Sequence, residues 1–337
     1  MESHTGLPAT KTQAGLFRSF GIATVFSVFF LILVGGIVRS TGSGMGCPDW
    51  PKCFGTWIPP TQVEQLPADY QERFSTENHS VAEFSVFKTW TEYLNRLLGV
   101  LVGILIFITL LLSLRFRRQR PIVTILSLAA FILVAFVGWL GAKVVASNLM
   151  PGMITIHMLG AILVTGCLIF AVSYAKSPEL SALRPGSMTG IRAYWTVCIS
   201  LAFMQLILGT QVREAIDIVA KELNDTQREL WIDRMPLVFY IHRSASLAFL
   251  VLSFLLHYRI RGASSDANSV LKASNIHLIV TFIAIALGIV LAYLDMPAFA
   301  QPLHLLMGSM VCFTSLYLGT LIFPDFALVG KGKTHSA

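Results

Sequence analysis

The sequence predicts an all-α polytopic membrane protein whose eight transmembrane helices form two pseudo-symmetric four-helix bundles. Of its 337 residues, 55% are hydrophobic and only 13% are charged, whereas about a quarter of the residues of a soluble domain are charged. Long uncharged intervals also recur at the length of roughly 20 residues that a helix needs to cross the hydrocarbon core. An internal repeat, described below, predicts the two bundles. No strand is needed.

The uncharged intervals give the expected spans in order. The first follows Lys11 and Arg18, but it is too long for the core of a signal peptide and no small-residue cleavage site follows it, so we interpret it as a span. The eight intervals cover residues 19–38, 97–114, 121–142, 158–175, 193–212, 236–256, 273–294 and 300–323.

The basic residues predict the orientation, because Lys and Arg in short loops stay on the cytoplasmic side. Both termini are therefore expected in the cytoplasm. The net charge of +7 follows from topology and contact with anionic lipid, so it does not indicate nucleic-acid binding. The polar, arginine-poor N-terminus favours a bacterial inner membrane over an organelle. The basic residues in question are Arg115, Arg117, Arg118, Arg120, Lys176, Arg184, Arg192, Arg259, Arg261, Lys272, Lys331 and Lys333.

A single offset of 147 residues relates the two halves of the chain. It separates Asn95 from His242, Arg96 from Arg243, Gly141 from Gly288 and His157 from His304. The glycine-x-x-Val-Arg segment at 35–39 recurs at 209–213, displaced further because the first external loop is 27 residues longer. Repeated helical units of this kind are common in membrane proteins. The expected domains are a cytoplasmic tail (1–16), an N-terminal bundle (17–176) with an external loop (40–91), a cytoplasmic linker (177–192), a C-terminal bundle (193–323) and a tail (324–337).

The repeat places His157, His242 and His304 near the external starts of even-numbered helices, with Asn95 at the fourth equivalent position. A single intramembrane histidine is often a hydrogen-bonded packing residue. Three at equivalent positions favour a function, because ionisable groups are costly in the membrane, and imidazole is a common axial ligand of haem iron. We interpret the remaining histidines as structural: His4, His79, His257, His277 and His335.

Arginines support the haem interpretation by occurring where topology disfavours them. Arg39, Arg96, Arg213 and Arg243 lie at external helix ends and form two repeat pairs. Haem propionates suit guanidinium groups at the membrane surface. The alternative is that these side chains reach lipid phosphate or loop acids such as Asp49 and Asp233.

The cysteines fall into two groups. Cys167, Cys198 and Cys312 lie in expected spans, where a thiol is most often a packing residue. Cys47 and Cys53, in the external segment GCPDWPKC, favour a disulfide in an oxidising compartment. A zinc site is the weaker alternative, because no nearby ligands complete a tetrahedral set.

The halves differ at Glu92, whose equivalent is Phe239. Glu92 precedes Asn95 by three residues and is expected on the same side of a helix, facing the metal that His157 binds. A carboxyl group there is suited to accept or deliver protons. The alternative is a helix-start acid that complements the macrodipole and pairs with Arg96.

Together, GGIVRSTGSGMGCPDWPKC, the EYLNR turn, His157, the HRS segment from His242 and the final His304 resemble haem A synthase, which matures haem for cytochrome c oxidase. The resemblance implies haem b bound by His242 and His304, and haem o as the substrate of the N-terminal half. It implies oxidation of a ring methyl to a formyl group by successive hydroxylations, with Glu92 important for activity, and a disulfide between Cys47 and Cys53. Haem o synthase and cytochrome c oxidase assembly factors are the implied partners.

The sequence departs from this family at Asn95, where many relatives have histidine. Asparagine is a poor iron ligand, so the N-terminal haem is expected to be bound by His157 alone or with water, which leaves a coordination position open. The main alternative function is a non-catalytic di-haem electron-transfer subunit, which needs neither Glu92 nor a half with one imidazole. A transporter is expected to place its polar groups at midplane instead. The sequence does not determine whether the chain forms a homo-oligomer.

Overall fold

The computed structural model describes residues 11–75, 81, 83–147, 149–175, 188–224, 226–264 and 268–323. The predicted C-terminal tail, residues 1–10 of the predicted N-terminal tail and most of the predicted linker therefore lie outside the described residues. So do several side chains named above, which are His4, His79, His335, Lys176, Arg184, Lys331 and Lys333.

The described residues contain eight long helices that are apolar enough to cross a membrane, which confirms the predicted class and number of spans. A short helix, α2 (Tyr70–Phe74), lies in the loop that the sequence predicts to be external, and the one β-bridge within the described residues joins Cys53 and Thr56. The long helices are α1 (Lys11–Ser40), α3 (Val86–Ser113), α4 (Pro121–Ala146), α5 (Pro151–Tyr174), α6 (Met188–Glu222), α7 (Leu237–Ala263), α8 (Ser269–Tyr293) and α9 (Ala300–Ile322).

α3 and α6 extend furthest beyond their uncharged intervals. α3 begins at Val86, where the Ser85 hydroxyl accepts a hydrogen bond from the backbone N–H of Lys88, as a helix cap does. α6 continues to Glu222, so the loop between α6 and α7 begins later than the sequence predicts. Its extra turns bury residues such as Ile216 and Val219 against Trp231. An uncharged interval marks only the part of a helix in hydrocarbon, whereas these ends are held by protein contacts.

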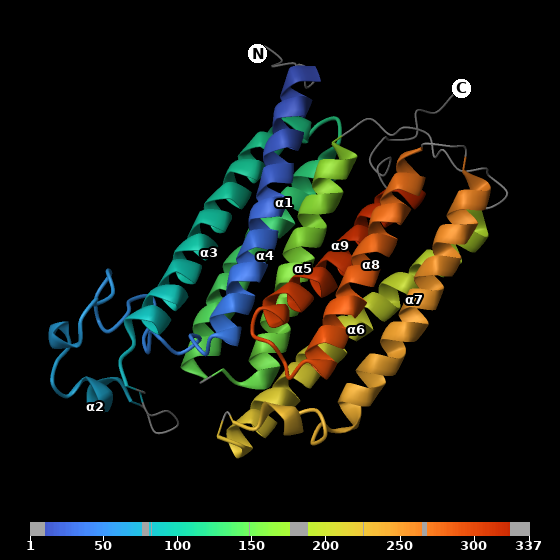
Figure 1. Ribbon diagram of the computed structural model, residues 1–337. Helices are drawn as coiled ribbons and strands as arrows, with labels where there is room; N and C mark the ends of the chain where they lie inside the picture. Colours follow the sequence, from blue (N-terminus) through green and yellow to red (C-terminus); the bar gives the residue numbers. More distant parts are fainter. Residues whose placement is uncertain are drawn as a thin grey trace, which may run out of the picture.

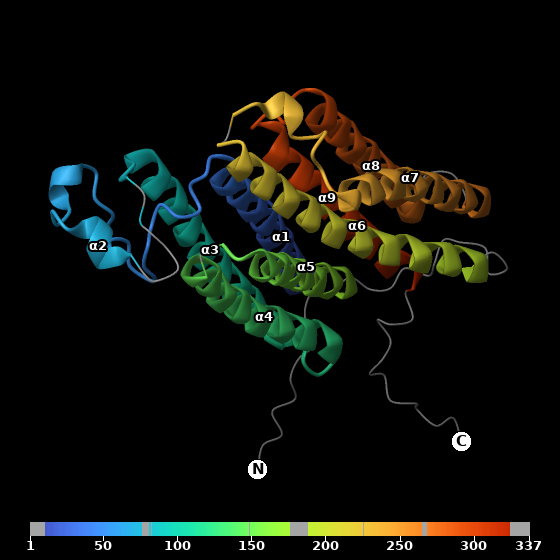
Figure 2. The same cartoon turned by 90° about the horizontal axis from the view of Figure 1, so that it is seen from below.

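The helices pack in two closed rings of four (Figures 1 and 2). In the first ring α1 packs on α3, α3 on α4, α4 on α5 and α5 on α1; in the second α6, α7, α8 and α9 follow the same cyclic order. The rings meet where α9 packs on α1 and α5, and where α5 contacts α6. Phe29 of α1 stacks on Phe313 of α9 at this junction, with ring centroids 5.0 Å apart. The domain boundaries and the pseudo-symmetry of the two bundles stay predictions.

The two ends of the molecule differ in character. The first turn of α1, the last turn of α9 and the arginine-rich α3–α4 connection lie at one end, and the loop that carries α2 lies at the other (Figure 1). Large apolar side chains such as Phe26, Val100, Ile132 and Val251 remain exposed along the helices. Lipid is the natural solvent for such surfaces. The chain is therefore a multi-pass membrane protein.

Candidate functional site

His242 and His304 face each other across the second ring. They lie on α7 and α9, which are diagonal members of that ring, and their ring centroids are 6.4 Å apart with planes at 87°. Two imidazoles that share one metal need a centroid separation of about 6 Å, because each metal–nitrogen bond is about 2 Å long and each nitrogen lies about 1 Å from its ring centre. The observed pair fits one iron between the two rings.

A backbone contact orients one of the predicted ligands, His304. His304 Nδ1 lies 2.9 Å from the carbonyl oxygen of Ala284. His157 Nδ1, by contrast, is buried without a hydrogen-bond partner. A histidine that donates one ring N–H to a carbonyl presents its other nitrogen to a metal. The contact of His304 with Ala284 thus leaves its Nε2 available as a ligand.

A glycine on a neighbouring helix lies against each of the four ligand positions. An added Cβ would lie 3.4 Å from His157 Cε1 at Gly141, 3.4 Å from His242 Cε1 at Gly209 and 3.2 Å from His304 Cε1 at Gly288. At Gly35 it would lie 3.9 Å from Asn95 Oδ1. These glycines mark the repeat in the sequence, but only the structure shows their role. Each lets a helix approach the ligand side chain closely.

Three polar atoms at these positions are buried without a hydrogen-bond partner: Asn95 Oδ1, His157 Nδ1 and His242 Nδ1. Buried polar atoms of native proteins nearly always have a partner. Unpartnered polar atoms beside these glycines are suited to contact a bound group. The donor set, three imidazoles and an amide at repeat positions, fits two haems. Among the described residues no three or more His, Cys, Asp or Glu side chains form a metal cluster, and haem iron takes only two axial ligands from the protein.

The glycine contact predicts a loss of binding when a branched side chain replaces Gly141. In Gly141→Val, the two methyl groups extend beyond a Cβ that is already 3.4 Å from His157 Cε1, so we expect the retained N-terminal haem to fall several-fold. Gly138→Val on the same helix is the control, because an added Cβ there meets nothing within 4 Å. Haem per polypeptide after purification measures the effect. Equal retention by both variants would contradict the role assigned to Gly141.

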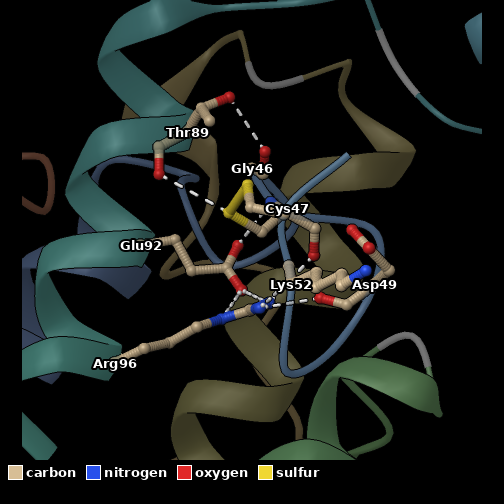
Figure 3. A network of polar contacts seen from close by, with 8 residues as sticks. Gly46, Cys47, Asp49, Lys52, Thr89, Glu92 and Arg96 are labelled. Carbon is tan, nitrogen blue, oxygen red and sulfur yellow. Dashed lines mark hydrogen bonds and ion pairs between the residues drawn. A yellow bond between two sulfur atoms is a disulfide. The ribbon is translucent and has the colours of Figure 1, made fainter. Parts of the chain in front are cut away.

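Glu92 is buried on α3 and holds the external loop (Figure 3). Its Oε2 accepts a hydrogen bond from the backbone N–H of Cys47 at 2.9 Å, and its Oε1 lies 2.5 Å from Arg96 Nη2. One turn earlier, the Thr89 hydroxyl donates to the carbonyl of Gly46 at 2.9 Å. A Cβ at Gly46 would overlap the backbone of Lys88, so only glycine permits this approach. Glu92 therefore pairs with Arg96, which is the alternative that the sequence analysis left open. It also contacts the loop, which the sequence did not indicate.

Arg96 uses all five of its N–H groups within the chain. Nε donates to Glu92 Oε1, and Nη2 donates to Glu92 Oε1 and to Cys47 O, the latter at 3.0 Å. Nη1 donates to Asp49 O at 2.7 Å and to Lys52 O at 3.0 Å. A guanidinium has five donors, so none is left for an outside anion in this arrangement. Its repeat partner Arg243 is exposed and lies over the Tyr240 ring at 5.3 Å. The predicted propionate role therefore suits Arg243 better than Arg96.

The other repeat pair of arginines converges on Asp217, which the sequence analysis did not identify. Arg39 Nη2 lies 2.5 Å from Asp217 Oδ2, and Arg213 Nη2 lies 2.8 Å from Asp217 Oδ1. Arg213 also donates to Gln301 Oε1 at 2.6 Å. The spacing of Arg213 and Asp217 predicts an ion pair between them, since residues four apart share a helix face. No local pattern predicts the contact with Arg39, which depends on the fold.

The structure agrees with the interpretation that the sequence favours for each group of cysteines. Cys47 and Cys53 form a disulfide that closes the loop held by Glu92 and Arg96, so their sulfurs are bonded to each other and not to zinc. Cys167, Cys198 and Cys312 are free thiols within helices. The disulfide gives the loop a fixed shape above the start of α3.

Comparison with known proteins shows a match that spans both halves. Residues 18–316 match the family described as "Cytochrome oxidase assembly protein". A protein named "Heme A synthase" from Nitrosospira multiformis is 26% identical over 318 residues, or 86% of this chain and 88% of the relative. That from Sinorhizobium fredii is 26% identical over 326 residues, covering 85% and 84%. That from Granulibacter bethesdensis is 29% identical over 198 residues, covering 55% and 52%. All candidate site residues lie within the matched range.

Proposed function

The chain belongs to the cytochrome oxidase assembly protein family, and on this premise we propose that it is a haem A synthase. In this proposal it oxidises a ring methyl of haem o to a formyl group by successive hydroxylations. The observation that carries the proposal is the difference between the two rings of helices. One has two facing histidines, whereas the other has one histidine, an asparagine at the second ligand position, and a buried acid one turn away.

The C-terminal ring is suited to hold haem b as a resident cofactor. His242 and His304 would be its axial ligands, and the glycines opposite them give the rings room. Haem b supplies one-electron transfer when bound. Because two imidazoles would fill both axial positions, this half is suited to pass electrons and not to bind oxygen.

The N-terminal ring is suited to hold haem o as substrate. His157 would be the protein ligand, and Asn95 would leave the opposite position without a strong donor. Glu92 is held in place by Arg96 and by the N–H of Cys47, so its carboxyl group is fixed one turn from Asn95. In this position Glu92 would accept or deliver protons during oxidation of the methyl group. The isoprenoid tail of haem o would lie in lipid or between helices.

Pigment analysis tests the proposed activity. The chain is produced together with a source of haem o, and the extracted haems are identified by mass. We expect the formyl product, haem A, in addition to haem b. Recovery of haem b and haem o alone would instead favour the di-haem electron-transfer subunit, which shares the histidines and arginines but has no use for Glu92.

Asn95→His tests the open coordination position. We expect the wild-type chain loaded with haem o to show a high-spin component, and the new imidazole to convert it to low spin, because the variant would supply a second strong axial ligand. Asn275→His is the control, since it places the same side chain on the exposed face of α8. Optical and electron paramagnetic resonance spectra report the spin state. A wild-type N-terminal haem that is already fully low spin would argue against the open position.

The setting follows from the same proposal. We place the chain in a bacterial inner membrane with both termini in the cytoplasm, so that the loop bearing the disulfide faces the oxidising side. Haem o synthase would deliver the substrate, and assembly factors of cytochrome c oxidase would receive the product. The basic α3–α4 connection at the end opposite this loop supports that orientation.

A further inference from the structure

Asp217 joins the two halves at the end of the molecule that holds the ligand positions. Each of its carboxylate oxygens meets one arginine, Arg39 from α1 and Arg213 from its own helix α6. These two arginines end the repeated glycine-x-x-Val-Arg segments. One acid therefore receives the equivalent arginine of both repeats, while the residue at its own repeat position is Ser43, so this arrangement has no copy in the other half.

Each arginine lies beside a ligand position through the same local geometry. Arg39 follows Gly35 by four residues and Arg213 follows Gly209 by four, so each arginine shares a helix face with its glycine. Gly35 faces Asn95 and Gly209 faces His242. The backbone of each arginine therefore lies about 5.4 Å, or one helical turn, along the helix from the glycine that faces the ligand position. Haem carboxylates, which are costly to bury unpaired, would be directed toward this polar end.

The charges around Asp217 are unbalanced. Two guanidinium groups share one carboxylate, and Nε of Arg213 is buried without a hydrogen-bond partner. Gln301 and Asp217 fix Arg213, but neither supplies a second negative charge. A half-buried cluster with excess positive charge is suited to bind carboxylates, and charge-assisted contacts to guanidinium groups are strong.

We propose that Asp217 is a positioning residue, the shared counter-ion of two haem-carboxylate contacts, made by Arg39 in the N-terminal half and by Arg213 in the C-terminal half. The inference rests on the proposed function, since it assumes a haem in each half. Asp217 holds both guanidinium groups before binding, which lowers the ordering cost that flexible arginines otherwise incur. It also links the two sites, because a change at this acid alters the surroundings of both haems.

The test compares single variants of the full chain purified with both haems. Arg39→Gln is expected to lower retained haem o several-fold and to leave haem b unchanged, and Arg213→Gln is expected to do the reverse. Asp217→Asn is expected to lower both. It should also raise the midpoint potential of the C-terminal haem, because loss of a nearby negative charge favours the reduced form. Asp217→Glu restores the charge and is expected to return the potential toward wild type.

Asp233→Asn is the matched control, since it removes the same charge from an exposed residue that precedes α7, and it is expected to change neither occupancy nor potential. The inference is overturned if Asp217→Asn lowers the retention of one haem only or of neither. It is also overturned if both haems remain bound and the midpoint potential of the C-terminal haem equals that of the wild type. If Asp217→Asn does not fold, the haem occupancy and the midpoint potential of Asp217→Glu decide whether the inference holds. A wild-type chain that retains no haem would instead refute the proposed function, and this inference with it.

Discussion

Glu92→Gln is expected to abolish haem A formation while haem b stays bound in the C-terminal half. The glutamine side chain still has an oxygen that accepts the N–H of Cys47, but it can no longer take up a proton as a carboxylate does or neutralise Arg96. Mass analysis of extracted haems measures the effect, with haem o accumulating in place of the formyl product. The expected loss of activity is close to complete.

Retention of haem b distinguishes lost chemistry from lost folding in this variant. Removing one partner of a buried ion pair costs about 3–5 kcal/mol, so a bound C-terminal haem is needed to show that the chain is intact. Glu83→Gln is the matched control, because it makes the same change at an exposed residue of the nearby loop. Wild-type yields of haem A from Glu92→Gln would remove this residue from the proposed mechanism.

His304→Ala is expected to remove haem b from the C-terminal half almost completely. The imidazole supplies one of two axial positions, its ring faces that of His242, and its Nδ1 is held by the carbonyl of Ala284. Alanine has no donor for the metal and leaves a cavity beside Gly288. Haem b per polypeptide and the amplitude of the low-spin signal are the measurements.

His257→Ala serves as the control for this loss. His257 lies on α7, the helix of His242, but pairs with Ser274 near the opposite end, with Nδ1 and Oγ 3.1 Å apart. We expect it to retain haem b with an unchanged spectrum. If His304→Ala kept a normal low-spin haem b, the pair of facing histidines would not be the axial ligands.

The spans could be predicted from the sequence because the bilayer imposes a local requirement, a long uncharged interval, on each of them. Helix ends were less predictable. α3 begins at Val86 because Ser85 caps it and the external loop packs on its first turns, and α6 continues to Glu222 because Trp231 covers its apolar face. Neither contact is visible in a window of local hydropathy.

The candidate site likewise has a part that the sequence predicted and a part that only the fold shows. The repeat offset identified the histidines and Asn95, because duplication leaves equivalent residues at a constant spacing. Contacts between distant segments were missed. Arg96 donates to the carbonyls of a loop more than 40 residues away, and Arg39 reaches Asp217 on a helix of the other half. From their positions, the sequence favoured propionates as the partners of both arginines, with lipid phosphate or loop acids as the alternative. The Arg96 contacts disfavour the propionate role, whereas Arg39 pairs with Asp217, an acid that the sequence did not indicate.

The central claim is that one half of the chain saturates its haem iron with two imidazoles while the other half leaves a position open beside Asn95. Electron paramagnetic resonance of the wild-type chain, loaded with one haem b and one haem o per polypeptide, tests it most directly. We expect one low-spin and one high-spin ferric signal, which correspond to equal amounts of haem after spin quantitation. Two low-spin signals, or two high-spin signals, would contradict it.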